Sequence, residues 1–177
     1  MNLANRISIT RIILVPFFVA SILYSKLTLA LFIFIVCILS DALDGYIARI
    51  KAQETRLGAL LDPIADKLLL ISAFVSFSVV SNIPFALRFP PYVPLIIVSR
   101  DVLIILGCIV IYLIKGKVDI KPTILGKMTT FMQMMSIVAI LIQFPFSAIL
   151  WNIAVILTVV SGLEYLRIGS VMINGSH

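Results

Sequence analysis

Four aspartates in the first half of the sequence are the residues best suited to chemistry. Asp41, Asp44, Asp62 and Asp66 are half of the eight acidic residues, and they fall within 26 positions of a largely apolar stretch. An aspartate near the middle of a membrane span costs about 2.5 to 3.5 kcal/mol, so four would cost on the order of 10 kcal/mol without compensation. Like charges held close together cannot all ionise without a cation. The cluster therefore predicts a bound positive ion.

The spacing of the aspartates predicts two helix faces that meet. At about 100° per residue, Asp41 and Asp44 lie about 60° apart on a helix, and Asp62 and Asp66 lie about 40° apart. A short turn between positions 50 and 57 makes the two helices antiparallel neighbours, so the four carboxylates meet at two matched depths. An all-carboxylate cluster suits a hard ion such as Mg²⁺ or Mn²⁺, and two ions bridged by shared carboxylates fit it.

The residues beside the aspartates indicate what such ions would hold. Gly45 and Ala48 leave the carboxylate face of the first helix bare, so that a flat or bulky group can lie against the backbone. Arg49 lies one turn nearer to water and is suited to a phosphate. Thr55, in the connection, adds a hydroxyl donor. Together these residues predict a site for a pyrophosphate that carries a nucleoside.

The same residues resemble a known family signature. The segment from Asp41 to Arg49 reads D-x-x-D-G-x-x-A-R, and the segment from Gly58 to Asp66 reads G-x-x-x-D-x-x-x-D. This is similar to the signature of the CDP-alcohol phosphotransferases, with all eight positions present. Further similarity, to bacterial members that use sn-glycerol 3-phosphate, lies in Asn5 to Arg11, Asp62 to Lys67, Gly126-Lys127 with Thr130 and Gln133, and Ser161-Gly162 before Tyr165.

The resemblance implies an activity and a role for each signature residue. The activity is transfer of a phosphatidyl group from CDP-diacylglycerol to an alcohol, with release of CMP, by two-metal catalysis. In the family, the first three aspartates hold metal, and the fourth also touches metal and acts as the base on the acceptor hydroxyl. The matching residues here are Asp41, Asp44 and Asp62 for metal, Asp66 for metal and base, and Gly45, Ala48 and Arg49 for the CDP moiety. The resemblance also implies a homodimer.

An acceptor such as sn-glycerol 3-phosphate needs a second cation, away from the CDP arginine. Arg100 and Lys127 are the first candidates, and Lys67 and Arg167 are the others. One position departs from the pattern, because Thr129 stands where these synthases usually have a second lysine. The departure weakens the choice of acceptor, and a sister reaction stays open: synthesis of cardiolipin from phosphatidylglycerol, or transfer to another polar alcohol.

The elements that position these residues are predicted to be membrane helices. Only 12% of the 177 residues are charged, against about 25% in an ordinary soluble domain. Since a spanning helix needs about 20 mostly apolar residues, the chain has room for about six. We therefore predict an all-α integral membrane protein, a single domain over 1–177, with the site at the cytoplasmic end of the second and third helices. The first expected helix is uncleaved and contains the apolar run 12–23, which is short for a span and is extended by residues at both ends. The others are 27–50, 57–80, 94–114, 124–144 and 146–166.

Basic residues orient this bundle. Ten of the fourteen lysines and arginines lie at the N-terminus, in the second and fourth connections and at the C-terminus. Because loops rich in positive charge stay on the cytoplasmic side, both termini are predicted to be cytoplasmic, in a bacterial inner membrane. The net charge of +6 is then explained by this topology and by contact with anionic membrane lipids, and no nucleic-acid partner is expected.

Several other readings of these patterns were open. The only histidine is His177, so chemistry that needs an imidazole base or ligand has no candidate within the predicted helices. Intramembrane aspartates also occur in cation and proton transporters, which spread them over several helices. Asp62 before Pro63 is also a typical helix start. Arg100 beside Asp101 is also compatible with a plain ion pair inside the bundle, and Gly107 suggests a close helix contact.

Overall fold

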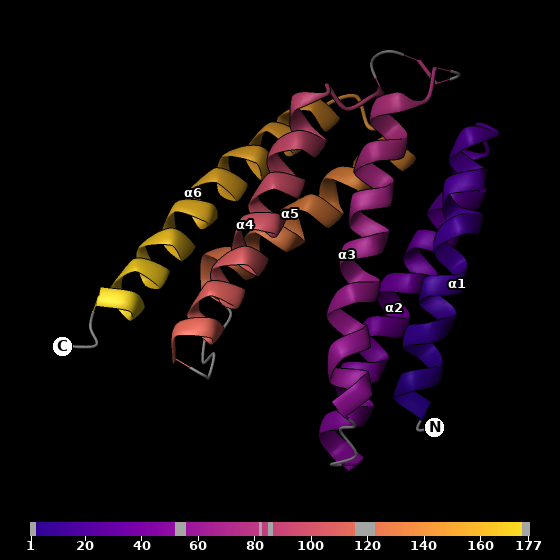
Figure 1. The fold of residues 1–177 in the computed structure, drawn as a ribbon. Coiled ribbons are helices and arrows are strands. Elements are labelled where there is room, and N and C mark those ends of the chain that lie inside the picture. The colour runs from indigo at the N-terminus through magenta and orange to yellow at the C-terminus, as the bar shows by residue number, and fades with distance from the viewer. Residues whose placement is uncertain (1–2, 52–55, 82, 85–86, 116–122, 175–177) are drawn as a thin grey trace. The chain divides into compact units, whose positions relative to one another are not determined.

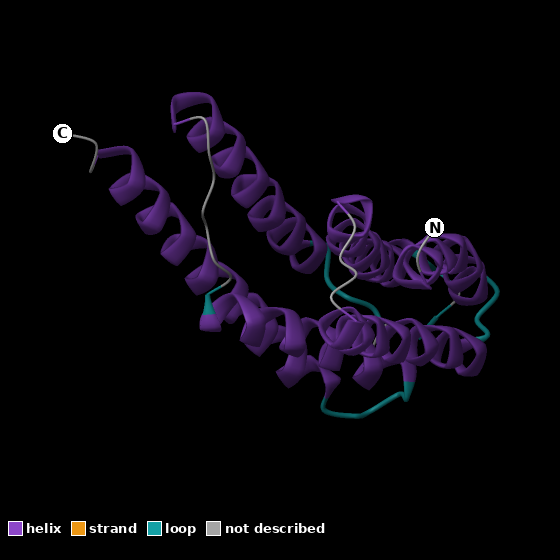
Figure 2. Ribbon diagram, turned by 90° about the horizontal axis from the view of Figure 1, so that it is seen from below, coloured by secondary structure: helices purple, strands orange, loops and turns teal. Residues whose placement is uncertain are grey.

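The structure is a computed structural model that describes residues 3–51, 56–81, 83–84, 87–115 and 123–174, with side chains described for 9–40, 64–81, 83–84, 87–114 and 123–172. Within these ranges the chain forms helices and no strand (Figures 1 and 2). The helices are α1 (Leu3–Leu23), α2 (Leu27–Lys51), α3 (Arg56–Val79), α4 (Tyr92–Lys115), α5 (Ile124–Leu141) and α6 (Ser147–Asn174). The all-helical prediction is therefore confirmed for the described chain.

Most helix bounds lie within two residues of the predicted ones. α1 begins at Leu3, so this helix extends before its apolar run as expected, although it adds no residue after position 23. α5 ends at Leu141 rather than at position 144, and α6 continues to Asn174, past position 166. The apolar run of α6 is thus only part of a longer helix. α3 begins at Arg56, six residues before Asp62, so the reading of Asp62 as a helix start is wrong.

Three helices in the described chain are long and apolar enough to cross a membrane. They cover Tyr92–Ile114, Ile124–Leu141 and Ser147–Met172. The apolar parts of α1 and α2 are shorter, at Ile9–Leu23 and Leu27–Ser40. Only 11% of the apolar window of α4 is buried within the chain, so most of this helix presents apolar side chains outward. A surface of that kind requires lipid or another protein around it.

The chain divides into two compact units. The first contains Met1–Arg88 with Ile140–Phe144, and the second contains Phe89–Ala139 with Pro145–His177. In the first unit, α1 packs against both α2 and α3. The rings of Phe18 and Phe34 stack there with centroids 5.6 Å apart. Both rings are fully buried, so they anchor α1 on α2.

α1 ends in a hydrogen-bonded cap that reverses the chain into α2. Ser25 has a left-handed backbone, with φ of 56°. Its N–H donates to the carbonyl of Ile22 at 2.9 Å, and the N–H of Lys26 donates to the carbonyl of Ser21 at 2.8 Å. This pair of bonds is a Schellman motif, which satisfies the last carbonyls of a helix. The cap makes α1 and α2 consecutive helices joined by a tight turn.

In the second unit, α4 packs against α6. Near the start of α4, the rings of Phe89 and Trp151 meet edge to face, with centroids 5.5 Å apart. The hydroxyl of Tyr92 donates to the side-chain oxygen of Asn152 at 3.0 Å. These contacts fix one end of the helix pair and leave the polar residues farther along α4 and α6 to face one another.

Candidate functional site

The two aspartate pairs lie at the end of one helix and near the start of the next. α2 ends ten residues after Asp41, and α3 begins ten residues before Asp66. Asp44 and Asp62 lie seven and six residues from the same two ends. The helix bounds therefore give the pairs matched distances from the connection between α2 and α3.

Of the four aspartates, only Asp66 has a described side chain. The predicted site side chains of Asp41, Asp44 and Asp62, and of Gly45, Ala48 and Arg49, lie outside the described residues, as does the whole of Thr55. Among the side chains that are described, no group of three or more His, Cys, Asp and Glu residues gathers as a metal site would. The metal site therefore stays a prediction from sequence spacing and helix bounds.

Asp66 is held by an arginine from another helix. Nη1 of Arg11, on α1, donates to Oδ1 of Asp66, on α3, as an ion pair. The Arg11 side chain is 1% exposed and that of Asp66 is 31% exposed. Removing one partner of a buried charge pair typically costs about 3 to 5 kcal/mol. This pair therefore ties α1 to α3 and fixes one oxygen of the carboxylate.

The sequence places Arg11 among the basic residues at the N-terminus and at the end of a segment that resembles the family, but does not predict it as a partner of Asp66. Its position in the chain nevertheless carries a signal, because a run of apolar residues follows it directly within the same helix. An arginine on the buried side of an apolar helix needs an acidic partner. The predicted face of Asp66 supplied that partner, and the two residues are brought together by the packing of α1 on α3.

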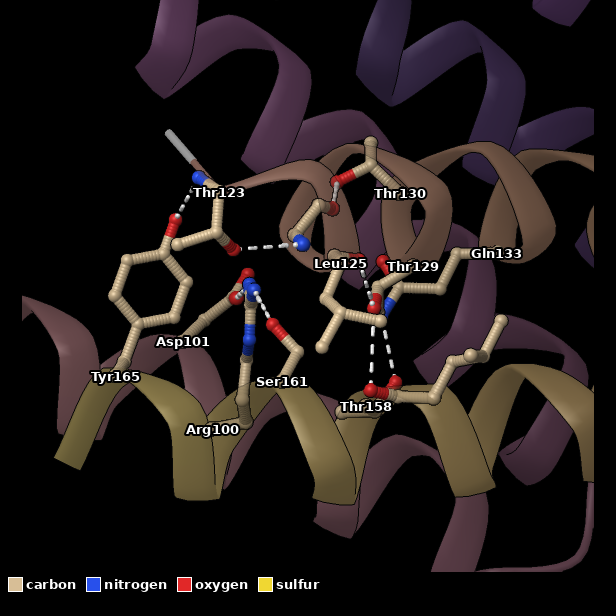
Figure 3. A network of polar contacts seen from close by, with 12 residues as sticks. Arg100, Asp101, Thr123, Leu125, Thr129, Thr130, Gln133, Thr158, Ser161 and Tyr165 are labelled. Carbon is tan, nitrogen blue, oxygen red and sulfur yellow. Dashed lines mark hydrogen bonds and ion pairs between the residues drawn. The ribbon is translucent and has the colours of Figure 1, made fainter. Parts of the chain in front are cut away.

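A second polar cluster lies in the other unit, around Arg100 of α4. Nη1 of Arg100 donates to Asp101 at 2.8 Å, and Nη2 donates to the hydroxyl of Ser161, on α6, at 2.7 Å. The guanidinium also lies over the ring of Tyr165, with Cζ 5.4 Å from the centroid (Figure 3). Arg100 is 12% exposed, and its buried Nε has no hydrogen-bond partner among the described residues.

The ion pair between Arg100 and Asp101, considered from sequence as an alternative, is thus present. A guanidinium has five N–H donors in a planar fork that matches carboxylate or phosphate oxygens. Two of these donors serve Asp101 and Ser161. The ion pair therefore leaves donor capacity for an anion.

Tyr165 joins this arginine to the start of α5. The Tyr165 hydroxyl accepts a hydrogen bond from the backbone N–H of Thr123 at 3.2 Å. Oγ1 of Thr123 accepts from the N–H of Gly126 at 3.0 Å, as an N-cap residue does. Figure 3 shows Thr123 next to the hydroxyl end of the Tyr165 side chain and Arg100 next to its ring.

A third set of polar residues fastens α5 to α6. Thr129 is fully buried, and its hydroxyl lies 2.8 Å from the carbonyl of Leu125 and 3.2 Å from that of Leu157. Nε2 of Gln133 donates to the Thr158 hydroxyl at 3.1 Å. Thr129, the position that departs from the pattern of the similar synthases, thus takes part in helix packing.

The remaining acceptor candidates lie apart from the Arg100 contacts. Lys127 is exposed in the first turn of α5, where its N–H donates to the carbonyl of Thr123 at 3.1 Å. Arg167 is exposed on α6, two residues after Tyr165 and therefore on a different face of that helix. Lys67 is partly exposed on α3, directly after Asp66. Of these three residues, only Lys127 lies in the first turn of α5, next to Thr123, whose N–H donates to the Tyr165 hydroxyl.

An open groove of about 300 Å³ runs between α4 and α6 beside this cluster. Its walls are largely apolar, and Arg100 and Tyr165 contribute its polar groups together with Ser170. A Cβ added at Gly107, on the α4 wall, would meet no atom within 4 Å. The prediction of a close helix contact at Gly107 is therefore wrong for the described chain. An anion in this region would bind at the Arg100 end, since the Ser170 hydroxyl already donates to the carbonyl of Arg167 and the rest of the walls is largely apolar.

Comparison with known proteins agrees with the signature. A model of the CDP-alcohol phosphatidyltransferase family matches residues 1–160. The CDP-diacylglycerol–glycerol-3-phosphate 3-phosphatidyltransferase of Aquifex aeolicus is 33% identical, over 98% of this chain and 98% of its own. The Bacillus subtilis protein with the same name is 32% identical, over 93% of each chain. Human cardiolipin synthase (CMP-forming) is 31% identical, over 95% of this chain and 62% of its own.

Proposed function

The chain belongs to the CDP-alcohol phosphatidyltransferase family, and from this premise we propose that it transfers a phosphatidyl group from CDP-diacylglycerol to sn-glycerol 3-phosphate. The acceptor oxygen forms a bond to the phosphatidyl phosphorus, and the bond from that phosphorus to the bridging pyrophosphate oxygen breaks. CMP leaves, and the lipid product is phosphatidylglycerophosphate. The observation that carries the proposal is the eight-position signature on α2 and α3, in a chain similar over nearly its whole length to enzymes named for this reaction.

Asp41, Asp44, Asp62 and Asp66 are the residues that would hold two divalent ions, Mg²⁺ or Mn²⁺. Their donors are all carboxylate oxygens, which suit hard cations, and the bounds of α2 and α3 place the two pairs at matched distances along the chain from the connection between these helices. Asp66 is 31% exposed, so its carboxylate is open to an ion as well as to Arg11. When bound, the ions draw negative charge from the pyrophosphate and make CMP a better leaving group.

Residues of the protein then deprotonate the acceptor hydroxyl and bind the CDP moiety. Asp66 takes the proton from the attacking hydroxyl, and Arg11 holds its carboxylate in place. Gly45 and Ala48 leave room for CDP against α2. Arg49 and Thr55 donate hydrogen bonds to its phosphates.

Arg100 and Lys127 bind the phosphate of the acceptor, with Lys67 and Arg167 as weaker candidates. Arg100 is the best supported of these, because its guanidinium is already fixed by Asp101, Ser161 and Tyr165. A fixed guanidinium loses little freedom when it binds an anion.

We also propose that the chain works as one transmembrane domain over 1–177, with six spans and both termini in the cytoplasm of a bacterial cell. Three helices already have the length and composition of spans. The outward apolar side chains of α4 would contact lipid or the second subunit of a homodimer.

The second candidate is the sister reaction in which phosphatidylglycerol is the acceptor. It is favoured by the similarity to human cardiolipin synthase and by the replacement of the usual lysine with Thr129. The same metal and CDP residues would serve, so only the acceptor differs.

A panel of acceptors separates the two candidates. Purified protein with Mg²⁺ or Mn²⁺ and CDP-diacylglycerol is given sn-glycerol 3-phosphate, phosphatidylglycerol, glycerol, serine or inositol, and CMP release is measured against a reaction without acceptor. We expect release with sn-glycerol 3-phosphate alone. Release with phosphatidylglycerol alone would favour the sister reaction, and no release with any acceptor would refute the proposed activity.

A further inference from the structure

One side chain in the second unit touches residues from two other helices. Tyr165 of α6 places its ring against the Arg100 guanidinium of α4, at 5.4 Å. Its hydroxyl accepts the Thr123 N–H, directly before α5, at 3.2 Å. Figure 3 shows both contacts on the same side chain. A displacement of Tyr165 would therefore change its contact with α4 and its contact with the start of α5.

The Tyr165 hydroxyl lies close to two residues at the start of α5, Thr123 and Gly126. A Cβ placed on Gly126 would lie 3.0 Å from that hydroxyl oxygen and 3.2 Å from Oγ1 of Thr123. Both distances are shorter than ordinary van der Waals contact, so an alanine at 126 would push the Tyr165 hydroxyl or the Thr123 side chain away by a few tenths of an ångström. Glycine at 126 therefore permits the close approach of Tyr165.

Lys127 follows Gly126 in the same turn. Its backbone N–H donates to the Thr123 carbonyl at 3.1 Å, so the backbone of Lys127 is fixed by the residue that Tyr165 holds. Arg100 is fixed from its own side by Asp101 and Ser161. Tyr165 therefore contacts both the fixed guanidinium of Arg100 and the start of the helix turn that contains Lys127.

We propose that Tyr165 is a positioning residue for the acceptor phosphate, because it holds the first turn of α5, with Lys127, in register with Arg100. The inference rests on the proposed function, in which Arg100 and Lys127 bind the phosphate of sn-glycerol 3-phosphate. Tyr165 does not contact the reacting atoms in this account. It sets how the two cations are presented.

Two substitutions separate the contacts of Tyr165. Tyr165→Phe keeps the ring beside Arg100 and loses the hydrogen bond to Thr123, whereas Tyr165→Leu loses both contacts. Since one hydrogen bond contributes about 0.5 to 1.5 kcal/mol, we expect Tyr165→Phe to raise the KM for sn-glycerol 3-phosphate about 2- to 12-fold. Tyr165→Leu should raise it further. The KM for CDP-diacylglycerol should not change in either variant.

Gly126 provides a test of the same contact from the other side. Gly126→Ala should raise the KM for sn-glycerol 3-phosphate, because the new methyl group displaces the Tyr165 hydroxyl. Once Tyr165→Phe has removed that oxygen, the approach to Thr123 Oγ1 remains but the shortest contact is gone, so Gly126→Ala should add less than in the parent protein and the two effects should be less than additive. Gly107→Ala is the matched control, since its Cβ would meet no atom within 4 Å, and it should leave both KM values unchanged.

A readout that needs no turnover keeps this inference separate from the proposed function. Hydrogen exchange of the peptide covering residues 123–131 should be faster in Tyr165→Phe than in the parent protein, because Thr123 loses its acceptor. Faster exchange together with a selective rise in the KM for sn-glycerol 3-phosphate would support the positioning role. Unchanged exchange, or an equal rise in the KM values of both substrates, would overturn it. A parent protein without activity on sn-glycerol 3-phosphate would refute the proposed function and leave exchange to decide whether Tyr165 holds α5.

Discussion

Replacing either partner of the ion pair between Arg11 and Asp66 tests whether Asp66 is a base or only a structural carboxylate. The informative set is Asp66→Asn, Arg11→Met and the double variant that carries both changes. Asparagine keeps the shape of the side chain and cannot take up the proton. Methionine keeps much of the apolar stem of arginine and removes its charge.

The magnitudes follow from the burial of the two side chains. Asp66→Asn removes a carboxylate from beside a guanidinium that is 1% exposed, so the free energy of unfolding should fall by about 3 kcal/mol. Arg11→Met leaves a carboxylate that is 31% exposed and within reach of water, so the loss should be nearer to about 1 kcal/mol. The double variant leaves neither charge and should be less destabilised than the sum of the single changes, with a coupling of about 2 kcal/mol.

Thermal unfolding in detergent and CMP release should be measured on the same preparations. A loss of about 3 kcal/mol corresponds to a melting midpoint lower by about 6 to 12 °C for a chain of this size. If Asp66 is the base, the double variant recovers stability while turnover stays lost, and binding of CDP-diacylglycerol is largely kept. Recovery of turnover in the double variant would refute the role of Asp66 as base, and additive losses of stability would refute the coupling of the pair.

Three further outcomes are expected. A chelator should stop CMP release, and excess Mg²⁺ or Mn²⁺ should restore it; release that continues with chelator present would contradict the metal site. Phe18→Ala should lower the free energy of unfolding by about 3 to 5 kcal/mol, because Phe18 is fully buried against Phe34, while Phe17→Ala, at a side chain 61% exposed, should change the melting midpoint little. Thr158→Val should destabilise by about 1 to 3 kcal/mol, since it leaves the buried amide of Gln133 without its acceptor; a melting midpoint equal to that of the parent would contradict this reading of the bond.

Much of the fold could be predicted because apolar runs, prolines and charges mark helices directly. The four aspartates were recognisable from their own spacing, and the helix bounds give them matched distances along the chain from the connection between α2 and α3. The extension of α1 before its apolar run was expected because that run is too short for a span, whereas the end of α6 was missed because a helix continues beyond the apolar segment when its last turns reach polar surroundings. A hydropathy pattern records only the segment inside the apolar layer.

The partners of the site residues were harder to predict because they come from distant parts of the sequence. Arg11 and Asp66 are 55 residues apart in the chain, and their pairing depends on the packing of α1 against α3. Tyr165 was noted within a motif, but its contacts with Thr123 and Arg100 arise only when α4, α5 and α6 are assembled. Thr129 was noted only as a departure from the family pattern. The structure gives it a packing role, because its hydroxyl contacts the carbonyl of Leu157 on α6.

The most direct test of the central claim is anomalous scattering from crystals of the protein grown with Mn²⁺. The account predicts two manganese peaks among the carboxylates of Asp41, Asp44, Asp62 and Asp66, at the end of α2 and the start of α3. Manganese bound elsewhere, or carboxylates of α2 and α3 that point apart with no peak among them, would contradict it.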